Sequence, residues 1–261
     1  MTTLATGSAP ALLGLATGAS LATTVWLASL KAHDASIVDA VWSFLVWLPA
    51  AVAFAASEQS GPRAPVVLLL SLAWALRLSL HIARRQHGQP EDARYQAIRA
   101  RNEPNFAWKS LIIVFWLQAV LGWIVGAPLA AAATSQSRWS PFDALGVALM
   151  AFGIVFEAVA DTQLARFKRD PGQRGRVLAT GLWRYSRHPN YFGECCVWWG
   201  AWLLAPAAGA PWTVVSPLLM TVLLLKVSGV TLLEKDIGER RPAYADYVRR
   251  TNAFVPGRPR S

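Results

Sequence analysis

Long apolar runs alternate with short polar and basic segments along the whole chain. A helix that crosses the hydrocarbon core of a bilayer needs about 20 mainly apolar residues. The runs that are long enough are 10–30, 37–56, 64–83, 110–133, 142–164, 191–210 and 212–233. This pattern predicts an all-α, polytopic membrane protein with seven transmembrane helices, built as a single domain over residues 1–261.

The basic residues distinguish one side of the predicted bundle from the other. Twenty of the 25 Lys and Arg residues fall in the first, third and fifth connections and in the C-terminal tail. The connections on the opposite side hold only Arg63 and Arg138. Because segments rich in Lys and Arg stay in the cytoplasm, we expect the N-terminus outside the cell and the C-terminus in the cytoplasm.

Composition supports the membrane class and excludes two others. Hydrophobic residues make up 54% of the chain and charged residues 15%, whereas soluble domains carry about 25% charged residues. Disordered chains and soluble nucleic-acid-binding domains need more polar surface than this, so we expect no nucleic-acid partner despite the net charge of +10. Residues 1–10 contain no Lys or Arg, so we expect the first apolar run to be retained rather than cleaved as a signal peptide.

The cysteines and histidines indicate neither a disulfide framework nor a metal site. Cys195 and Cys196 are adjacent in an apolar run, and neighbours on a helix point about 100° apart. The His, Cys and Asp residues show no spacing typical of metal ligands, and the sequence contains no nucleophile elbow. We therefore expect no metal.

Ionisable residues inside the predicted spans are candidates for function, because a charge at the bilayer centre costs roughly 2.5–3.5 kcal/mol. They are Asp39, Arg77, His81, Glu157, Asp161, Glu194 and Lys226, together with Glu58 at the end of a span. The alternative is that charges near span ends pair or extend to the interface. Asp39 and Trp42, three residues apart near the cytoplasmic end of the second run, are candidate substrate-binding residues, although Asp39 is equally explained as a cap or ion-pair partner.

One helical face in the fifth run carries a polar track. Glu157 and Asp161 are four residues apart, and Lys168 continues the same face into the fifth connection. An internal ladder of ion pairs is one explanation of this spacing. The functional explanation is a polar track that leads to a connection with seven basic residues. We favour this explanation.

Residues 181–194 carry the most informative local pattern. Pro189 suits the first turn of a helix, where its missing N–H costs nothing. Asn190 and Glu194 then share one face of that helix, and an amide beside a carboxylate suits recognition of a carboxamide or of ribose hydroxyls. A capped helix that enters the membrane explains Ser186 and Pro189, but it leaves Asn190 and Glu194 without a role.

A helix N-terminus beside a basic loop suits a phosphate group. Two phosphorylated partners are open: a dinucleotide cofactor and lipid head groups. The sequence has no G-x-G-x-x-G or Walker motif, so a nucleotide would need a site of another kind.

Three segments together resemble the steroid 5-alpha-reductase family, and most closely its bacterial branch. They are residues 157–168, residues 181–194 with the string RHPNYFGE, and the tail segments 232–235 and 244–247; the likeness runs from about residue 36 to residue 256. The shorter pattern R-H-P-x-Y-x-G is shared with isoprenylcysteine methyltransferases. The resemblance implies a seven-helix membrane reductase, placed in a bacterial inner membrane, that uses NADPH with its cofactor side facing the cytoplasm.

The resemblance also implies roles for individual residues. The residues that match the family's cofactor set are Asp161, Lys168, Arg176, Asn190 and Glu194, with weaker matches at Arg84, Arg94, Tyr95 and Tyr247. The family holds the substrate ketone with an acid on the second span and a tyrosine on the third, and Glu58 and His81 lie nearest those positions. His81 in place of the tyrosine, and Glu157 in place of a family asparagine, are departures from the pattern.

The resemblance thus implies NADPH-dependent reduction of the 4,5 double bond of a 3-oxo-4-ene steroid or similar lipophilic enone. Hydride would arrive at the β-carbon while hydrogen-bond donors stabilise the developing enolate. Two alternatives stay open: an S-adenosylmethionine-dependent membrane methyltransferase, and a non-catalytic protein that binds membrane lipid or acts as a scaffold.

Overall fold

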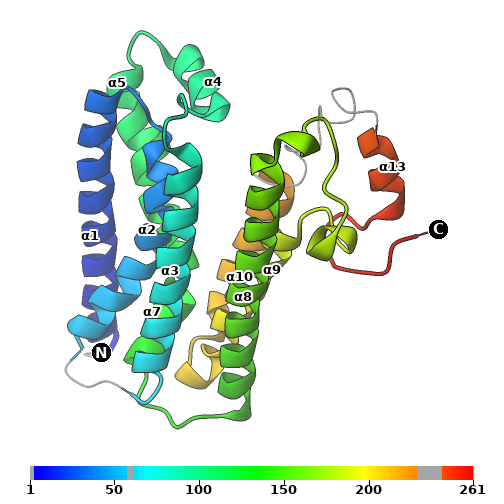
Figure 1. Ribbon diagram of the computed structural model, residues 1–261. Coiled ribbons are helices and arrows are strands. Elements are labelled where there is room, and N and C mark those ends of the chain that lie inside the picture. Colours follow the sequence, from blue (N-terminus) through cyan, green and yellow to red (C-terminus); the bar gives the residue numbers. More distant parts are fainter. Residues whose placement is uncertain (1–2, 58–60, 228–242, 261) are drawn as a thin grey trace. The chain divides into compact units, whose positions relative to one another are not determined.

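Every element that the computed structural model describes is a helix (Figure 1). The structure describes residues 3–57, 61–227 and 243–260, and these ranges contain no strand. Among them are five helices long and apolar enough to cross a membrane: Ala9–Ala32, Ile37–Ala55, Ala64–Gln86, Phe106–Val125 and Pro141–Arg169. They coincide with the first five predicted spans, so the prediction of an all-helical, multi-pass membrane protein is confirmed.

Within the residues that the structure describes, no helix long enough for a span covers the sixth or the seventh predicted run. The helix α9 (Pro189–Leu203) has 15 residues, and the apolar helix Pro211–Lys226 falls below the length of a span. The run 191–210 is interrupted because Pro206 begins a short 3-10 turn and Gly209 adopts a φ of 78°. The end of the seventh predicted span, 228–233, lies outside the described residues. Seven spans and the orientation of the termini therefore stay predictions.

The chain forms two compact units. Unit 1 comprises Met1–Asp143 and Leu204–Ser216, and unit 2 comprises Ala144–Leu203 and Pro217–Ser261. The elements of unit 1 are α1 (Thr3–Ala32), α2 (Ile37–Ala55), α3 (Ala64–Gln86), α4 (Ala93–Asn102), α5 (Phe106–Ser110), the π-helical turn η1 (Leu111–Trp116), α6 (Leu117–Val125), α7 (Ala127–Thr134) and the 3-10 turns η4 (Pro206–Ala208) and η5 (Pro211–Val214).

In unit 1, α2 is the central helix. It packs against α1, α3, α6 and α7, while α1 also packs against η1 and α6 (Figure 1). The residues of α2 that face these neighbours are buried, among them Val38, Leu45 and Val46. Helix α4 lies at the end of the bundle where α1 ends and α2 begins (Figure 1).

Tryptophan side chains link the helices of unit 1 through hydrogen bonds. The Nε1 groups of Trp26 and Trp123 donate to the carbonyls of Ala107 and Ala11, each over 2.9 Å. Trp47 Nε1 donates to the carbonyl of Leu68 over 3.2 Å and so joins α2 to α3. Because lipid offers no hydrogen-bond partner, such contacts between helices hold a membrane bundle together alongside close packing.

A fully buried ion pair fixes the end of unit 1 where α3 begins. The Arg63 guanidinium donates to both carboxylate oxygens of Asp143 over 2.7 and 2.8 Å, and both side chains are 0% exposed. Arg63 also donates to the carbonyls of Ser137 and Arg138 over 2.6 Å each. This Arg63, which the sequence pattern assigned only to a connection, therefore tethers the segment that leads into the next long helix.

Unit 2 contains a close helix pair, α8 (Pro141–Arg169, whose first residues belong to unit 1) and α9. Its other elements are the 3-10 turns η2 (Pro171–Gln173) and η3 (Gly181–Arg184), α10 (Val215–Val222, which also begins in unit 1), the π-helical turn η6 (Leu223–Val227) and α13 (Ala243–Arg250). A Cβ on Gly153 of α8 would lie 2.5 Å from the carbonyl oxygen of Gly193 on α9. A Cβ on Gly200 would lie 2.7 Å from the carbonyl oxygen of Gly146. Glycines on both helices therefore let the two backbones touch.

We predict that Gly153→Ala destabilises the protein, whereas Gly18→Ala does not. The alanine methyl at residue 153 would meet backbone atoms of Gly193 and Val197, and overpacking of this kind costs about 1–3 kcal/mol. Gly18 on α1 has no atom within 4 Å of an added Cβ, so alanine there gains about 0.5–1 kcal/mol of helix propensity. Thermal unfolding of both variants in detergent checks this, and equal melting temperatures would show that the α8–α9 contact is not tight.

Candidate functional site

The polar residues predicted on α8 and α9 come together in unit 2. Glu157 and Asp161 lie one turn apart on α8, and both are only 5% exposed. The Asn190 side-chain amide on α9 donates to Asp161 Oδ1 over 3.2 Å. Asp161 and Asn190, two residues of the predicted cofactor set, therefore lie in contact, and this contact follows from the close approach of the two helices at Gly153 and Gly193.

Glu194 occupies the next turn of α9 and is also buried, at 4% exposure. Its Oε1 accepts a hydrogen bond of 2.9 Å from Trp198 Nε1, four residues further along the same helix. Gly193, the residue before Glu194, packs against the backbone of Glu157 on α8. A Cβ on Gly193 would lie only 2.8 Å from Glu157 N. Three acidic residues and one carboxamide thus occupy a short length of this helix pair.

Residues 181–188 lie against the end of α8. Trp183 Nε1 donates to the carbonyl of Ala160 over 3.0 Å, and the backbone N–H of Leu182 donates to Gln163 Oε1 over 2.9 Å. Gly181 adopts a φ of 59°, in the left-handed region that glycine tolerates. These contacts bring the segment back to the turn of α8 that carries Asp161.

Residues 251–254 of the C-terminal segment also bind residues 186 and 187. Ser186 Oγ donates to the carbonyl of Phe254 over 2.7 Å, and the N–H of Arg187 donates to the carbonyl of Asn252 over 2.9 Å. The Arg187 guanidinium donates to the carbonyl of Thr251 over 2.6 Å. Arg187, one of the basic residues of the fifth connection, is therefore engaged with the tail of the chain.

Tyr247 on α13 acts as a buried clamp on this segment. It is 7% exposed, and its hydroxyl donates to the carbonyls of Trp183 and Ser186. Its ring packs edge-on against Tyr244 at 5.6 Å between centroids. Tyr247 was predicted to contact a cofactor, and the contacts that the structure shows for it position the 181–188 segment.

The basic residues of the fifth connection are mostly exposed. Lys168, which was predicted to continue the polar face of α8, and Arg176 both have exposed side chains. Around them lie further exposed cations at Arg166, Arg169 and Arg174. The connection turns at Gly175, where φ is 79°. It presents cations to solvent rather than burying them against α8.

A second polar group forms in unit 1 around Asp39, in the first turn of α2. Asp39 Oδ1 accepts a hydrogen bond of 2.6 Å from the Tyr95 hydroxyl, and Oδ2 accepts one of 2.7 Å from Arg94 Nη2. Gln118 Nε2 on α6 donates to the Tyr95 hydroxyl over 2.9 Å. We call these four residues the Asp39 group. It joins a predicted substrate residue to two predicted cofactor residues.

The charges around the Asp39 group reinforce one another. Burial beside the Asp39 carboxylate raises the pKa of Tyr95 well above its ordinary value, so the phenol stays protonated. Burial by itself would lower the pKa of Arg94, but its hydrogen bond to Asp92 and the charge of Asp39 raise it. Burial would likewise raise the pKa of Asp92, and the hydrogen bonds from Arg94 outweigh it and lower that pKa.

The remaining predicted residues that the structure describes lie on α2 and α3. Trp42 and His81 are half-buried on α2 and α3, and Arg84 is exposed in the last turn of α3. Glu58, the predicted catalytic acid, lies outside the described residues. Within the described ranges no three His, Cys, Asp or Glu residues are placed to hold a metal ion.

Comparison with known proteins places this chain in a family. A family model described as "Protein of unknown function (DUF1295)" matches residues 25–251. The chain belongs to the DUF1295 family. It is also 25% identical over 280 residues to "Uncharacterized protein C594.04c" of Schizosaccharomyces pombe (strain 972 / ATCC 24843), a match that covers 95% of this chain and 80% of that protein. No solved structure is significantly similar.

Several residues of this DUF1295 chain that shape the two groups escaped the sequence pattern. Gln118, which donates to Tyr95, lies in the fourth apolar run. The sequence pattern that could have identified it is a single amide among apolar residues. Gln163 and Trp183 act through backbone partners 19 and 23 residues away. Such contacts carry no fixed spacing along the chain, so a pattern search does not find them.

We predict that Tyr247→Phe destabilises unit 2. Loss of the hydroxyl leaves the buried carbonyls of Trp183 and Ser186 without this donor, and an unsatisfied buried group costs about 1–3 kcal/mol. Tyr185→Phe is the matched control, because Tyr185 is 42% exposed. Thermal unfolding and limited proteolysis after residue 180 measure the difference, and a Tyr247→Phe protein as stable as the control contradicts the clamp.

Proposed function

We propose that this protein is an NADPH-dependent membrane reductase of a lipophilic enone, related to the steroid 5-alpha-reductase family that its motifs resemble. The proposal includes seven spans, with the basic connections and the cofactor side in the cytoplasm. The observation that carries it is the hydrogen-bonded pair Asp161–Asn190, one helical turn from the buried Glu194.

The chemistry of this residue set fits a nicotinamide dinucleotide. Asn190 uses one side-chain N–H on Asp161, and its amide oxygen and second N–H have no partner among the described residues. Asn190 therefore has one hydrogen-bond donor and one acceptor that are unused by the described residues. The nicotinamide carboxamide offers a complementary acceptor and donor. Carboxylates such as Asp161 and Glu194 accept hydrogen bonds from ribose hydroxyls.

The exposed cations of the fifth connection suit the phosphates of the same cofactor. Lys168 and Arg176 are placed on the solvent side of unit 2, where they would contribute charge without a large desolvation cost. The resemblance also assigns Arg84 to the cofactor. NADPH, when bound, supplies the hydride that the reaction requires.

The task of the protein at the substrate is to hold the carbonyl oxygen and to stabilise the negative charge that develops there. Glu58 and His81 are the residues that the resemblance proposes for this role. An alternative acid–tyrosine pair is available in unit 1, because Asp39 on α2 is hydrogen-bonded to Tyr95. The Tyr95 phenol stays protonated, but its single O–H donates to Asp39. To be held by this pair, a substrate carbonyl would replace Asp39 as the acceptor of that hydrogen, while Gln118 holds the hydroxyl oxygen. Trp42 lies on the same helix as Asp39.

We predict that NADPH raises the melting temperature of the purified protein and that S-adenosylmethionine does not. Asn190→Ala and Glu194→Ala should weaken NADPH binding about tenfold or more, because each removes a polar group that would contact the cofactor. Asn102→Ala is the matched control, since that amide only bonds the carbonyl of Ile98 on its own helix. Stabilisation by S-adenosylmethionine alone would instead favour the methyltransferase, and stabilisation by neither would favour a non-catalytic lipid-binding protein.

We predict that loss of the carbonyl-holding donor lowers turnover and leaves NADPH affinity unchanged. Removing one donor of this kind typically costs about 10²–10³-fold in kcat. Reduction of a 3-oxo-4-ene steroid by Glu58→Gln, His81→Ala and Tyr95→Phe, measured beside NADPH affinity, shows which pair acts. If all three variants retain full turnover, both proposed pairs are wrong.

A further inference from the structure

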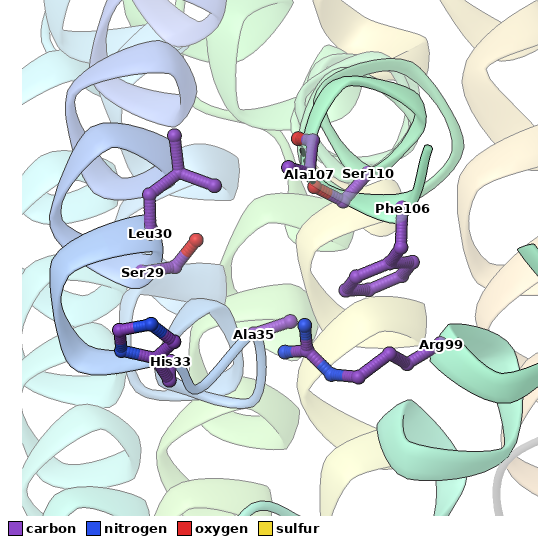
Figure 2. A pocket seen from close by; sticks show the side chains of 8 residues that line it. All are labelled: Ser29, Leu30, His33, Ala35, Arg99, Phe106, Ala107 and Ser110. Atoms are coloured by element: carbon purple, nitrogen blue, oxygen red, sulfur yellow. Dashed lines mark hydrogen bonds between the residues drawn. The ribbon is translucent and has the colours of Figure 1, made fainter. Parts of the chain in front are cut away.

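Unit 1 contains a cavity of about 260 Å³ that the predicted functional residues do not touch. It lies where α1 ends and α5 begins, and Figure 2 shows the side chains that surround it. Its lining residues are Ser29, Leu30, His33, Ala35, Arg99, Phe106, Ala107 and Ser110. The volume is below the roughly 300–1,000 Å³ of sites for drug-sized ligands, so a dinucleotide is too large for it.

Arg99 is the charged group of this cavity, and its position is fixed. Its Nη2 and Nε donate to the Glu91 carboxylate over 2.8 and 3.1 Å, and its guanidinium lies 4.4 Å from the ring centroid of Phe106. Glu91 in turn accepts the N–H of Ala35 over 2.8 Å. The third nitrogen of Arg99, Nη1, donates to no group among the described residues, and the guanidinium points toward the lining residues of the cavity (Figure 2).

The pair keeps its charges under ordinary conditions. Burial by itself would raise the pKa of Glu91, but the hydrogen bonds from Arg99 and from the Ala35 N–H lower it. The hydrogen bond to Glu91 raises the pKa of Arg99. The guanidinium is therefore a permanent, preorganised donor with one N–H₂ group to spare.

The surroundings of the cavity are those of a membrane interface. The candidate span Ala9–Ala32 ends at the cavity, and the candidate span Phe106–Val125 begins there. Trp108, which is 72% exposed, packs on Trp26 at 5.5 Å between ring centroids, and tryptophan is enriched at the level of lipid head groups. Exposed cations lie close to the lining residues along the chain at Lys31 and Lys109, and the charges of Glu103 and Asp34 act on Arg99 together with that of Glu91.

Apolar surface continues from the cavity along the two spans. Leu27 on α1 is 57% exposed, and Ile112 and Trp116 on η1 are 61% and 42% exposed. A free inorganic anion would gain no binding free energy from these apolar side chains. An amphiphile that carries a phosphate matches both the guanidinium and the apolar faces beside it, and basic pockets between transmembrane helices bind anionic head groups by this combination.

We propose that this cavity binds the phosphate of an anionic phospholipid head group. Arg99 Nη1 donates to a phosphate oxygen, while the acyl chains lie on the exposed apolar side chains of α1 and η1. The site is separate from the proposed reductase function and does not depend on it.

The test uses the full-length protein in a neutral detergent, titrated with phosphatidylglycerol, with phosphatidylcholine of the same acyl chains, or with inorganic phosphate. We expect phosphatidylglycerol to raise the melting temperature by about 3 °C or more at saturation. We expect the other two ligands to have little effect. An equal shift with phosphatidylcholine, or the full shift with inorganic phosphate alone, would overturn the proposal of an anionic lipid site.

Two variants remove the site in different ways. The double substitution Glu91→Gln with Arg99→Gln removes the guanidinium without leaving a lone carboxylate, and Ser110→Leu fills the cavity while keeping the pair. Both should abolish the phosphatidylglycerol shift, whereas Arg101→Gln, an exposed cation on the same helix, should retain it.

Native mass spectrometry provides a second readout of the same proposal. The wild-type protein should retain one more phosphatidylglycerol molecule than either cavity variant. Equal lipid retention in wild type and in the folded Ser110→Leu protein would overturn the proposal. NADPH affinity should be the same in all these proteins, which separates a failure of this proposal from a failure of the reductase assignment.

Discussion

The contact between α8 and α9 is the constraint on which the candidate cofactor site depends. Glycine at residues 153 and 193 lets the two backbones touch, and this brings Asn190 within hydrogen-bonding distance of Asp161. A side chain at either glycine would separate the helices and leave buried carboxylates in an apolar environment without an amide partner. The packing of these glycines thus positions the polar side chains of the candidate cofactor site.

A second constraint is that polar groups at membrane depth need partners within the protein. Unit 1 meets it with side chains that reach backbone carbonyls on other helices, as Trp26 and Trp123 do between α1 and the fourth span. The Asp39 group meets it by linking a carboxylate, a guanidinium, a phenol and an amide. These contacts explain in part why a chain of 261 residues carries 13 tryptophans.

The basic residues, which form one class in the sequence, separate into two classes in the structure. Arg63, Arg94, Arg99 and Arg187 each donate to carboxylates or carbonyls within their own unit. Lys168, Arg174 and Arg176 have exposed side chains. Counting charge per connection predicted membrane topology, because the insertion bias depends on the number of cations in a loop. It did not distinguish cations that hold the fold from cations that face solvent, since that depends on which acceptor lies nearby.

The sequence by itself determined the helical class, the five long apolar helices, and the shared helical faces of Glu157 with Asp161 and of Asn190 with Glu194. Apolar length and the four-residue helical period are local properties, and a chain folded in lipid must follow them. Only the tertiary structure decided that Tyr247 clamps residues 181–188, that Asp39 joins Arg94 and Tyr95, and that Arg99 faces a cavity. These contacts join residues 55 to 64 positions apart in the first two cases, or depend on how helix ends meet. No local period along the chain encodes such distances, because they are set by the packing of whole helices.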